Sequence, residues 1–194
     1  MSTTLPPTAP AAVEWNSGVL RALYELTFAE PDREVAGVLV GLASPQSPTG
    51  MPLVRAAIPV TQGFMPGQAS LFIHETWVQV HKTMARHYPR LATVGWYVSR
   101  PGNGIGLTEA DQLNHSRWFG HSGQVLLLVD SVAHRAAVYG WSANRLALLS
   151  DGTVARRDTG LHRRAIPVAA IVMLIIIGAA LGAVAFTLAQ ALGG

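Results

Sequence analysis

Two carboxylates and one histidine are the residue types that hydrolytic metal sites use. Asp111 and His115 lie four residues apart, so on a helix they would face the same side. Glu34 precedes the apolar run 35–42, where a buried carboxylate would need a partner. A catalytic zinc site needs about three protein ligands and an open water position. Asp111 and His115 alone do not supply them, so zinc chemistry would require further ligands.

The other histidines and polar residues form no recognised catalytic motif. His74 and His81 miss the spacing of a His-Glu-x-x-His motif by three residues. Ser99 has no histidine placed by the sequence to activate it. The chain has no cysteine, which excludes thiolate ligands and nucleophiles. We expect four histidines to be surface or half-buried side chains: His81, His87, His115 and His121.

The segment from Val94 to Asp111 resembles the metal-binding segment of the MPN (JAB/JAMM) metallopeptidase family with its histidines replaced. The family pattern is His-x-His-Pro followed, after a loop, by Ser-x-x-Asp. Pro101 and Asp111 keep this frame. Glu34, in the run Glu-Val-Ala-Gly-Val-Leu-Val-Gly, matches the glutamate that lies upstream in the family. The resemblance extends over residues 14–141 as an order of elements.

The resemblance implies a degenerate site. In the family the two histidines and the aspartate hold zinc, and the glutamate activates the bound water. Here Val98 and Arg100 stand in the histidine positions and Thr108 in the serine position. Valine has no donor atom and arginine cannot lose its proton, so we expect neither a metal nor another cofactor. We hypothesise that the Arg100 guanidinium takes the cation's place and bridges Glu34 and Asp111; the alternative is that it points to solvent.

Two local features around this segment have simpler structural explanations. Thr108 and Asp111 have the spacing of a capping box at a helix start, which favours a cap over a ligand role for Asp111. Gly102, Gly104 and Gly106 alternate without the Gly-Lys-Ser/Thr of a phosphate loop. We therefore expect these glycines to permit an irregular loop path.

The hydrophobic pattern predicts an α/β (α+β) domain over residues 14–142, in the order αββαβαββ. The resemblance implies a mixed sheet flanked by helices. Pro59 favours a place at an edge or at a strand end. The expected helices span about 16–29, 73–88 and 108–119, and the expected strands 35–42, 53–60, 91–98, 124–130 and 135–141.

The two ends of the chain have a different composition. Residues 1–13 are rich in Thr, Pro and Ala, which predicts a disordered tail. Residues 165–189 carry no charge over 25 positions, which predicts a transmembrane helix over residues 165–190. A GxxxG pattern at Gly178 and Gly182 would allow close helix packing. Residues 143–164 are expected to be a basic linker with some helical tendency at 144–149. Its membrane-proximal arginines are Arg156, Arg157, Arg163 and Arg164.

Charge and composition lead to three functional hypotheses. Residues 142–164 carry the whole formal net charge of +3, which favours a cytoplasmic domain and attraction to membrane lipids, with no nucleic-acid partner. The first hypothesis is a membrane-tethered, catalytically inactive MPN/JAB-like interaction or scaffold module, whose protein partner is a second copy or a catalytic MPN relative. The second is a metal-dependent isopeptidase or peptidase that recruits metal through His115 or a partner's residues. The third is a basic tail whose main role is lipid binding.

Overall fold

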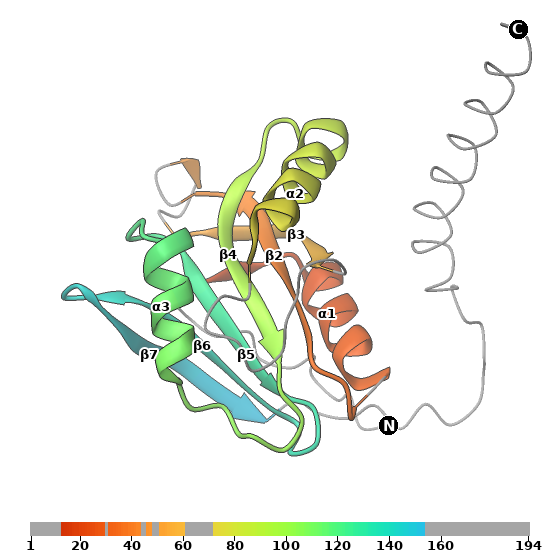
Figure 1. Cartoon of the computed structure of the whole chain (residues 1–194), viewed down its shortest axis with the longest axis vertical. Helices are drawn as coiled ribbons and strands as arrows, with labels where there is room; N and C mark the ends of the chain where they lie inside the picture. The colour runs from red at the N-terminus through yellow and green to blue at the C-terminus, as the bar shows by residue number, and fades with distance from the viewer. Residues whose placement is uncertain (1–12, 30, 44–45, 48–50, 61–71, 154–194) are drawn as a thin grey trace, which may run out of the picture. The chain divides into compact units, whose positions relative to one another are not determined.

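The computed structural model describes residues 13–29, 31–43, 46–47, 51–60 and 72–153, which form a seven-stranded mixed sheet and three helices (Figure 1). The strand order is β1-β3-β2-β4-β5-β6-β7. The mixed α/β fold expected from the sequence is confirmed. The elements are β1 (Glu14–Trp15), α1 (Ser17–Ala29), β2 (Val35–Leu42), β3 (Leu53–Val60), α2 (His74–His87), β4 (Ala92–Ser99), α3 (Glu109–Trp118), β5 (Val125–Asp130), β6 (Arg135–Ser142) and β7 (Arg145–Thr153).

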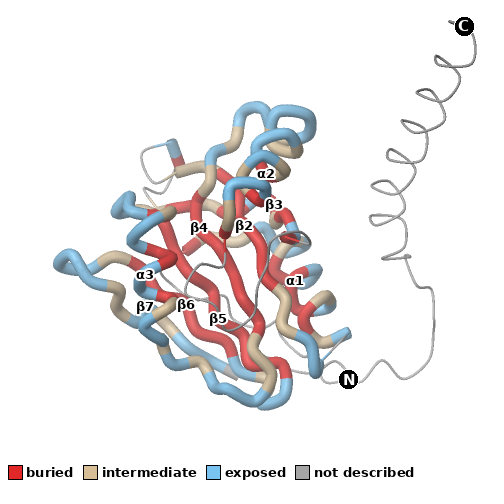
Figure 2. Tube along the Cα trace, in the orientation of Figure 1, coloured by how far each residue is buried: buried red, intermediate tan, exposed pale blue. Residues whose placement is uncertain are grey.

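Burial along each strand follows its place in the sheet. β2 and β5 are apolar and buried on both faces, as central strands are (Figure 2). β3 instead alternates between buried and more exposed residues. β1 pairs only with Leu53 and Val54, so Pro59 lies where β3 has β2 as its single described neighbour. A proline there costs no hydrogen bond to a second strand.

Two hydrophobic clusters cover the two faces of the sheet. On one face α1 packs through Leu20, Leu23 and Tyr24. On the other face Val80 of α2 and Phe119 at the end of α3 pack against the strands. β4 contributes Tyr97 to the first cluster and Trp96 and Val98 to the second, so this central strand connects both cores.

The parallel pairing of β4 with β5 requires a crossover, and α3 lies within it. The chain leaves β4 at Ser99, passes through residues 100–108 and enters α3. Within β4, Gly95 has φ +154°, and a Cβ there would lie 2.0 Å from the Val125 carbonyl oxygen. Only glycine allows β4 to approach β5 this closely.

The sheet has one strand more at each end than the sequence pattern predicts. β1 is a two-residue strand, too short for a periodic signal. At the other end, the expectation of a linker starting at residue 143, with helical tendency at 144–149, is wrong because Arg145–Thr153 pairs with β6. Ala143 and Asn144 have φ of 48° and 61°, as a two-residue hairpin turn requires. The folded domain therefore extends at least to Thr153.

The described residues contain no helix long and apolar enough to cross a membrane. The predicted transmembrane segment 165–190, with Gly178 and Gly182, lies outside the described part of the chain, and so do residues 1–12 of the predicted tail 1–13 and the four membrane-proximal arginines. These expectations stay predictions. Val13, the last residue of that predicted tail, is instead buried in the same hydrophobic cluster as Leu20 of α1.

Candidate functional site

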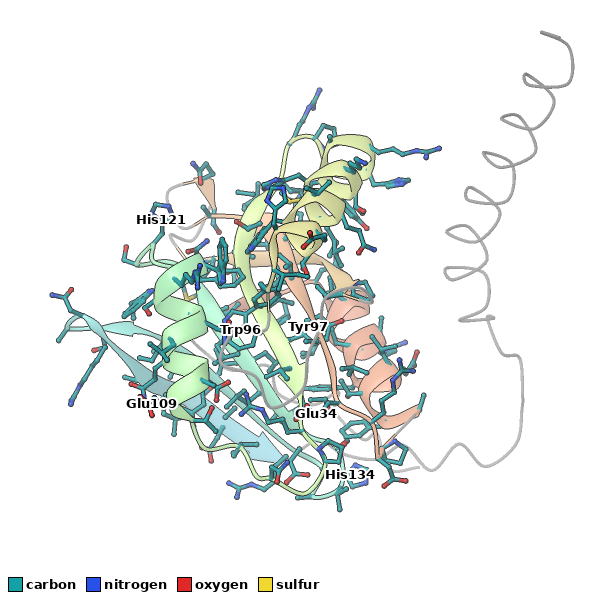
Figure 3. All side chains as sticks on the ribbon, in the orientation of Figure 1. Glu34, Trp96, Tyr97, Glu109, His121 and His134 are labelled. Carbon is teal, nitrogen blue, oxygen red and sulfur yellow. The ribbon has the colours of Figure 1, made fainter. Side chains whose placement is uncertain are left out.

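Strand register brings Glu34 and Arg100 together. Val35 of β2 pairs with Ser99 of β4 in antiparallel register. Glu34, just before β2, and Arg100, just after β4, are therefore also neighbours. Arg100 Nε lies 4.0 Å from Glu34 Oε1. Figure 3 shows Glu34 near the lower end of β4, close to where the sheet meets the loop that follows Ser99.

The Arg100 guanidinium also donates hydrogen bonds to Asp111 from both of its terminal nitrogens. Nη1 donates to Oδ2 at 2.9 Å, and Nη2 donates to Oδ1. The Asp111 side chain is fully buried and that of Arg100 is 14% exposed, so this paired contact is screened little by water. Arg100 thus lies between the two carboxylates, held more closely by Asp111 than by Glu34, and does not point away from the cluster.

Asp111 also caps α3, as the sequence predicts. The Thr108 hydroxyl accepts a hydrogen bond from the Asp111 backbone at 3.2 Å, and Asp111 Oδ2 accepts one from the Thr108 backbone at 2.8 Å. The Thr108 hydroxyl donates to the same carboxylate oxygen at 2.8 Å. The Asp111 carboxylate therefore binds both the first residues of α3 and the Arg100 guanidinium. The helix cap holds the carboxylate in the place where Arg100 meets it.

The residues at the positions that the resemblance aligns with the family's zinc ligands do not fit a zinc ion. Val98 is buried in the core beneath α2 and α3 and has no donor atom. Both Asp111 oxygens accept hydrogen bonds from Arg100, whose charge would repel a cation. In the part of the chain that the structure describes, no three His, Cys, Asp or Glu side chains gather as metal ligands would. No reaction step through zinc follows from this arrangement.

A fourth charged residue, Asp130, anchors the loop after Arg100. Its carboxylate accepts four backbone hydrogen bonds, from Gly102, Gly104, Val132 and Ala133, at 2.8–3.0 Å. Burial acts to raise the pKa of Asp130, but these four backbone donors outweigh it and hold the pKa below the ordinary value. Sequence reasoning missed this residue, although an aspartate at a strand end before a turn is a signal for local backbone capture.

Tyr139 anchors the same loop from β6. Its hydroxyl donates to the Ile105 carbonyl oxygen at 2.7 Å. Burial, followed by the charges of Asp151 and Asp111, raises the pKa of Tyr139, so the hydroxyl keeps its proton at neutral pH. With Asp130 at one end and Tyr139 at the other, the loop 101–107 is fixed to the sheet.

His115 departs from the expectation of a surface or half-buried side chain, because it is fully buried. Its Nδ1 accepts a hydrogen bond from Trp96 Nε1 at 3.1 Å, and the Trp141 and Phe119 rings lie 5.2 and 5.8 Å from its ring. The helix face that carries Asp111 also carries His115, and that face packs on the sheet. The other three histidines, His81, His87 and His121, are exposed as expected.

Comparison with known proteins shows a similarity of fold to a solved structure. No protein-family model matches the chain, and no curated protein matches it. A similar solved structure is the solution structure of protein DSY2949 from Desulfitobacterium hafniense, with a TM-score of 0.50 and 10% sequence identity, over 70% of this chain and 88% of that one. The similarity is one of fold alone. At this identity it carries no residue roles to the cluster around Arg100.

The burial of His115 predicts a loss of stability in mild acid. Burial lowers its pKa from 6.5 to about 4, and the backbone of Gln124 acts weakly in the opposite direction. Between these two pH values the unfolded chain binds a proton at this residue and the folded chain does not, so acidification favours unfolding. We expect the free energy of unfolding to fall by on the order of 3 kcal/mol from pH 6.5 to pH 4.

Urea denaturation of the full chain at a series of pH values measures this effect. His115→Gln is the matched control, because its amide oxygen can still accept from Trp96 but does not titrate. The variant should show a flatter profile in this pH window. An unchanged slope between pH 6.5 and 4 would assign the acid sensitivity to other groups.

Proposed function

We propose that this chain is a catalytically inactive MPN-like domain, tethered to the cytoplasmic face of a membrane by residues 165–190, that acts as a protein interaction or scaffold module. The observation that carries the proposal is the paired contact of Arg100 with the buried Asp111. In the resembling family the position of Arg100 holds a histidine and the position of Asp111 holds an aspartate, and both residues bind the same zinc ion. The Arg100 guanidinium in the place of the metal ion would hold the same segments together but would not activate a water molecule.

The positions in the sheet also support the proposal. Arg100 directly follows β4, two residues after Val98, and its backbone N–H donates to the Val129 carbonyl oxygen at 2.8 Å. The alternation of the extended chain therefore places both side chains on the same face. Asp111 is brought to that face by the start of α3, and Glu34 by the start of β2. Side chains from three separate segments therefore converge on Arg100, which supports the proposed correspondence with the family's metal site. Asp111 is not free to act as a general base, because both of its oxygens accept hydrogen bonds from Arg100.

We therefore propose that the domain acts by binding other molecules through its surface. The partner we propose is another protein: a second copy of this chain or a catalytic MPN relative to which this domain contributes a surface. Membrane lipids are the second proposed contact, through residues 156–164. The rigid loop 101–107, anchored by Asp130 and Tyr139, is suited to such a role because it presents a fixed backbone.

Restoring the family's ligands tests the assignment directly. In the double variant Val98→His with Arg100→His, two imidazoles and Asp111 would complete a three-ligand set with an open position. We expect the purified full-length variant to contain about one zinc ion per chain by elemental analysis, and zinc to raise its melting temperature. The unmodified chain should contain no stoichiometric zinc.

The matched control is Val98→His with Arg100→Ala, which provides one imidazole and should not retain zinc. If the double variant folds without gaining zinc, the proposed correspondence of positions is wrong. If the unmodified chain carries zinc and cleaves an isopeptide or peptide substrate in a zinc-dependent manner, the domain is a metal-dependent hydrolase and the inactive-module proposal fails.

A further inference from the structure

The exposed side of α2 is basic. Lys82 and Arg86 lie four residues apart on this helix, opposite the buried Val80, and both are exposed. Arg90 follows the helix and is also exposed. Among the described residues, none of these three side chains forms an ion pair. We call Lys82, Arg86 and Arg90 the α2 basic face.

The surrounding sequence leaves this positive charge uncompensated. No Asp or Glu occurs between Glu75 and Glu109. Glu75 is in the first turn of α2, seven residues before Lys82, which places it about 10 Å away along the helix axis. His81 and His87 flank the face and are exposed. A negatively charged surface would therefore meet three basic side chains at the C-terminal end of α2 without an acidic residue from the same stretch of sequence.

The length of chain after the sheet restricts what this face can meet. β7 ends at Thr153, and the uncharged run begins at Ala165. The intervening residues 154–164 can span at most about 40 Å when fully extended. If residues 165–190 cross a bilayer, the domain stays within that distance of the head groups. Such tethering raises the effective concentration of lipid at the domain, so a few charges suffice.

We propose that the α2 basic face docks on anionic phospholipid head groups of the membrane that anchors the chain. This inference rests on the proposed membrane tether. The cytoplasmic leaflet carries the negative surface potential that a positive face complements, and each basic residue near such a surface strengthens binding about fivefold. Docking through α2 orients the domain and leaves the α1 face of the sheet directed away from the bilayer, since α1 and α2 cover opposite faces.

The absence of cysteine allows a clean labelling experiment. A fluorophore is attached to full-length chain carrying Ala85→Cys, at an exposed α2 position, or Ala22→Cys, at an exposed α1 position. Each protein is reconstituted into nanodiscs that contain an acceptor lipid, with either phosphatidylglycerol and phosphatidylcholine or phosphatidylcholine alone. Energy transfer to the acceptor lipid reports which helix faces the bilayer.

We expect energy transfer from position 85 to increase in the anionic nanodiscs and to decrease at 1 M salt, where screening shortens the Debye length to about 3 Å. Position 22 should change little. The triple variant Lys82→Gln, Arg86→Gln, Arg90→Gln should lower the ratio of docked to undocked domain on the order of 100-fold. The matched control, Arg21→Gln, Arg55→Gln, Arg117→Gln, removes the same charge from exposed positions elsewhere and should leave docking nearly unchanged.

Two different negative results are distinguishable. If the protein is incorporated into nanodiscs but position 85 behaves alike in both lipid mixtures, or if the control variant loses as much energy transfer, α2 docking is refuted and the tether stands. If the protein is not incorporated at all, the proposed tether fails, and the inference fails with it.

Discussion

Replacing Arg100 with alanine is expected to lower the free energy of unfolding by about 3–5 kcal/mol, because it leaves the buried carboxylate of Asp111 without its cation. Asp111 is fully buried, and both of its oxygens accept hydrogen bonds from the guanidinium. Arg100→Lys should be intermediate, since an ammonium group cannot make the same paired contact. Urea denaturation of the full chain measures these differences.

An exposed ion pair provides the comparison for this prediction. Arg135 and Asp151 are joined at 3.1 Å, but their side chains are 52% and 43% exposed. Arg135→Ala should therefore cost at most about 1 kcal/mol. Adding Asp111→Asn to Arg100→Ala should recover part of the loss by neutralising the buried charge. Equal costs for Arg100→Ala and Arg135→Ala would show that Arg100 does not stabilise the cluster.

Replacing Asp130 with alanine should have a comparable effect, a loss on the order of 4 kcal/mol, because four backbone N–H groups lose their shared acceptor. Hydrogen exchange at Gly102 and Gly104 should accelerate, since these residues hold the loop to Asp130. Asp130→Asn keeps one carbonyl oxygen and should lose less. Asp151→Ala is the matched aspartate control, and faster exchange in that variant would point to a general loss of stability.

The pH dependence separates Asp130 from His115. The folded-state pKa of Asp130 lies below its ordinary value of 3.8, so its stabilising contribution is present above pH 3.8 and disappears as the pH falls through the lower, folded-state value. The His115 effect occurs between pH 6.5 and about 4. Asp130→Asn should therefore reduce the acid sensitivity below pH 3.8 and leave the higher window unchanged.

Much of the fold could be predicted from hydrophobic periodicity. The helices α1, α2 and α3 and the strands β2 to β6 begin and end within about one residue of the expected positions. β7 was missed because Arg145–Thr153 carries a bulge opposite Val138 and Tyr139, which breaks its alternation. Pairing with β6, a tertiary contact, decides its conformation.

The cluster could be anticipated only in part. The spacing of Thr108 and Asp111 predicted the capping box, and charge chemistry suggested a contact of Arg100 with carboxylates. The sequence signals the local contacts of Asp130 with Val132 and Ala133, but not those with Gly102 and Gly104, which depend on the parallel β4–β5 register. The burial of His115 likewise depends on Trp96 and Trp141, which belong to strands far from it in the sequence.

The pairing of β7 with β6 protects the domain against aggregation. Without Arg145–Thr153, β6 would become the outermost strand and expose unpaired backbone along the buried residues Ala136 to Tyr139. Such an apolar border recruits strands from neighbouring molecules. Proteolytic cleavage at the Ala143–Asn144 turn, followed by loss of the C-terminal piece, would therefore leave this edge of the sheet open to pairing with strands of other molecules.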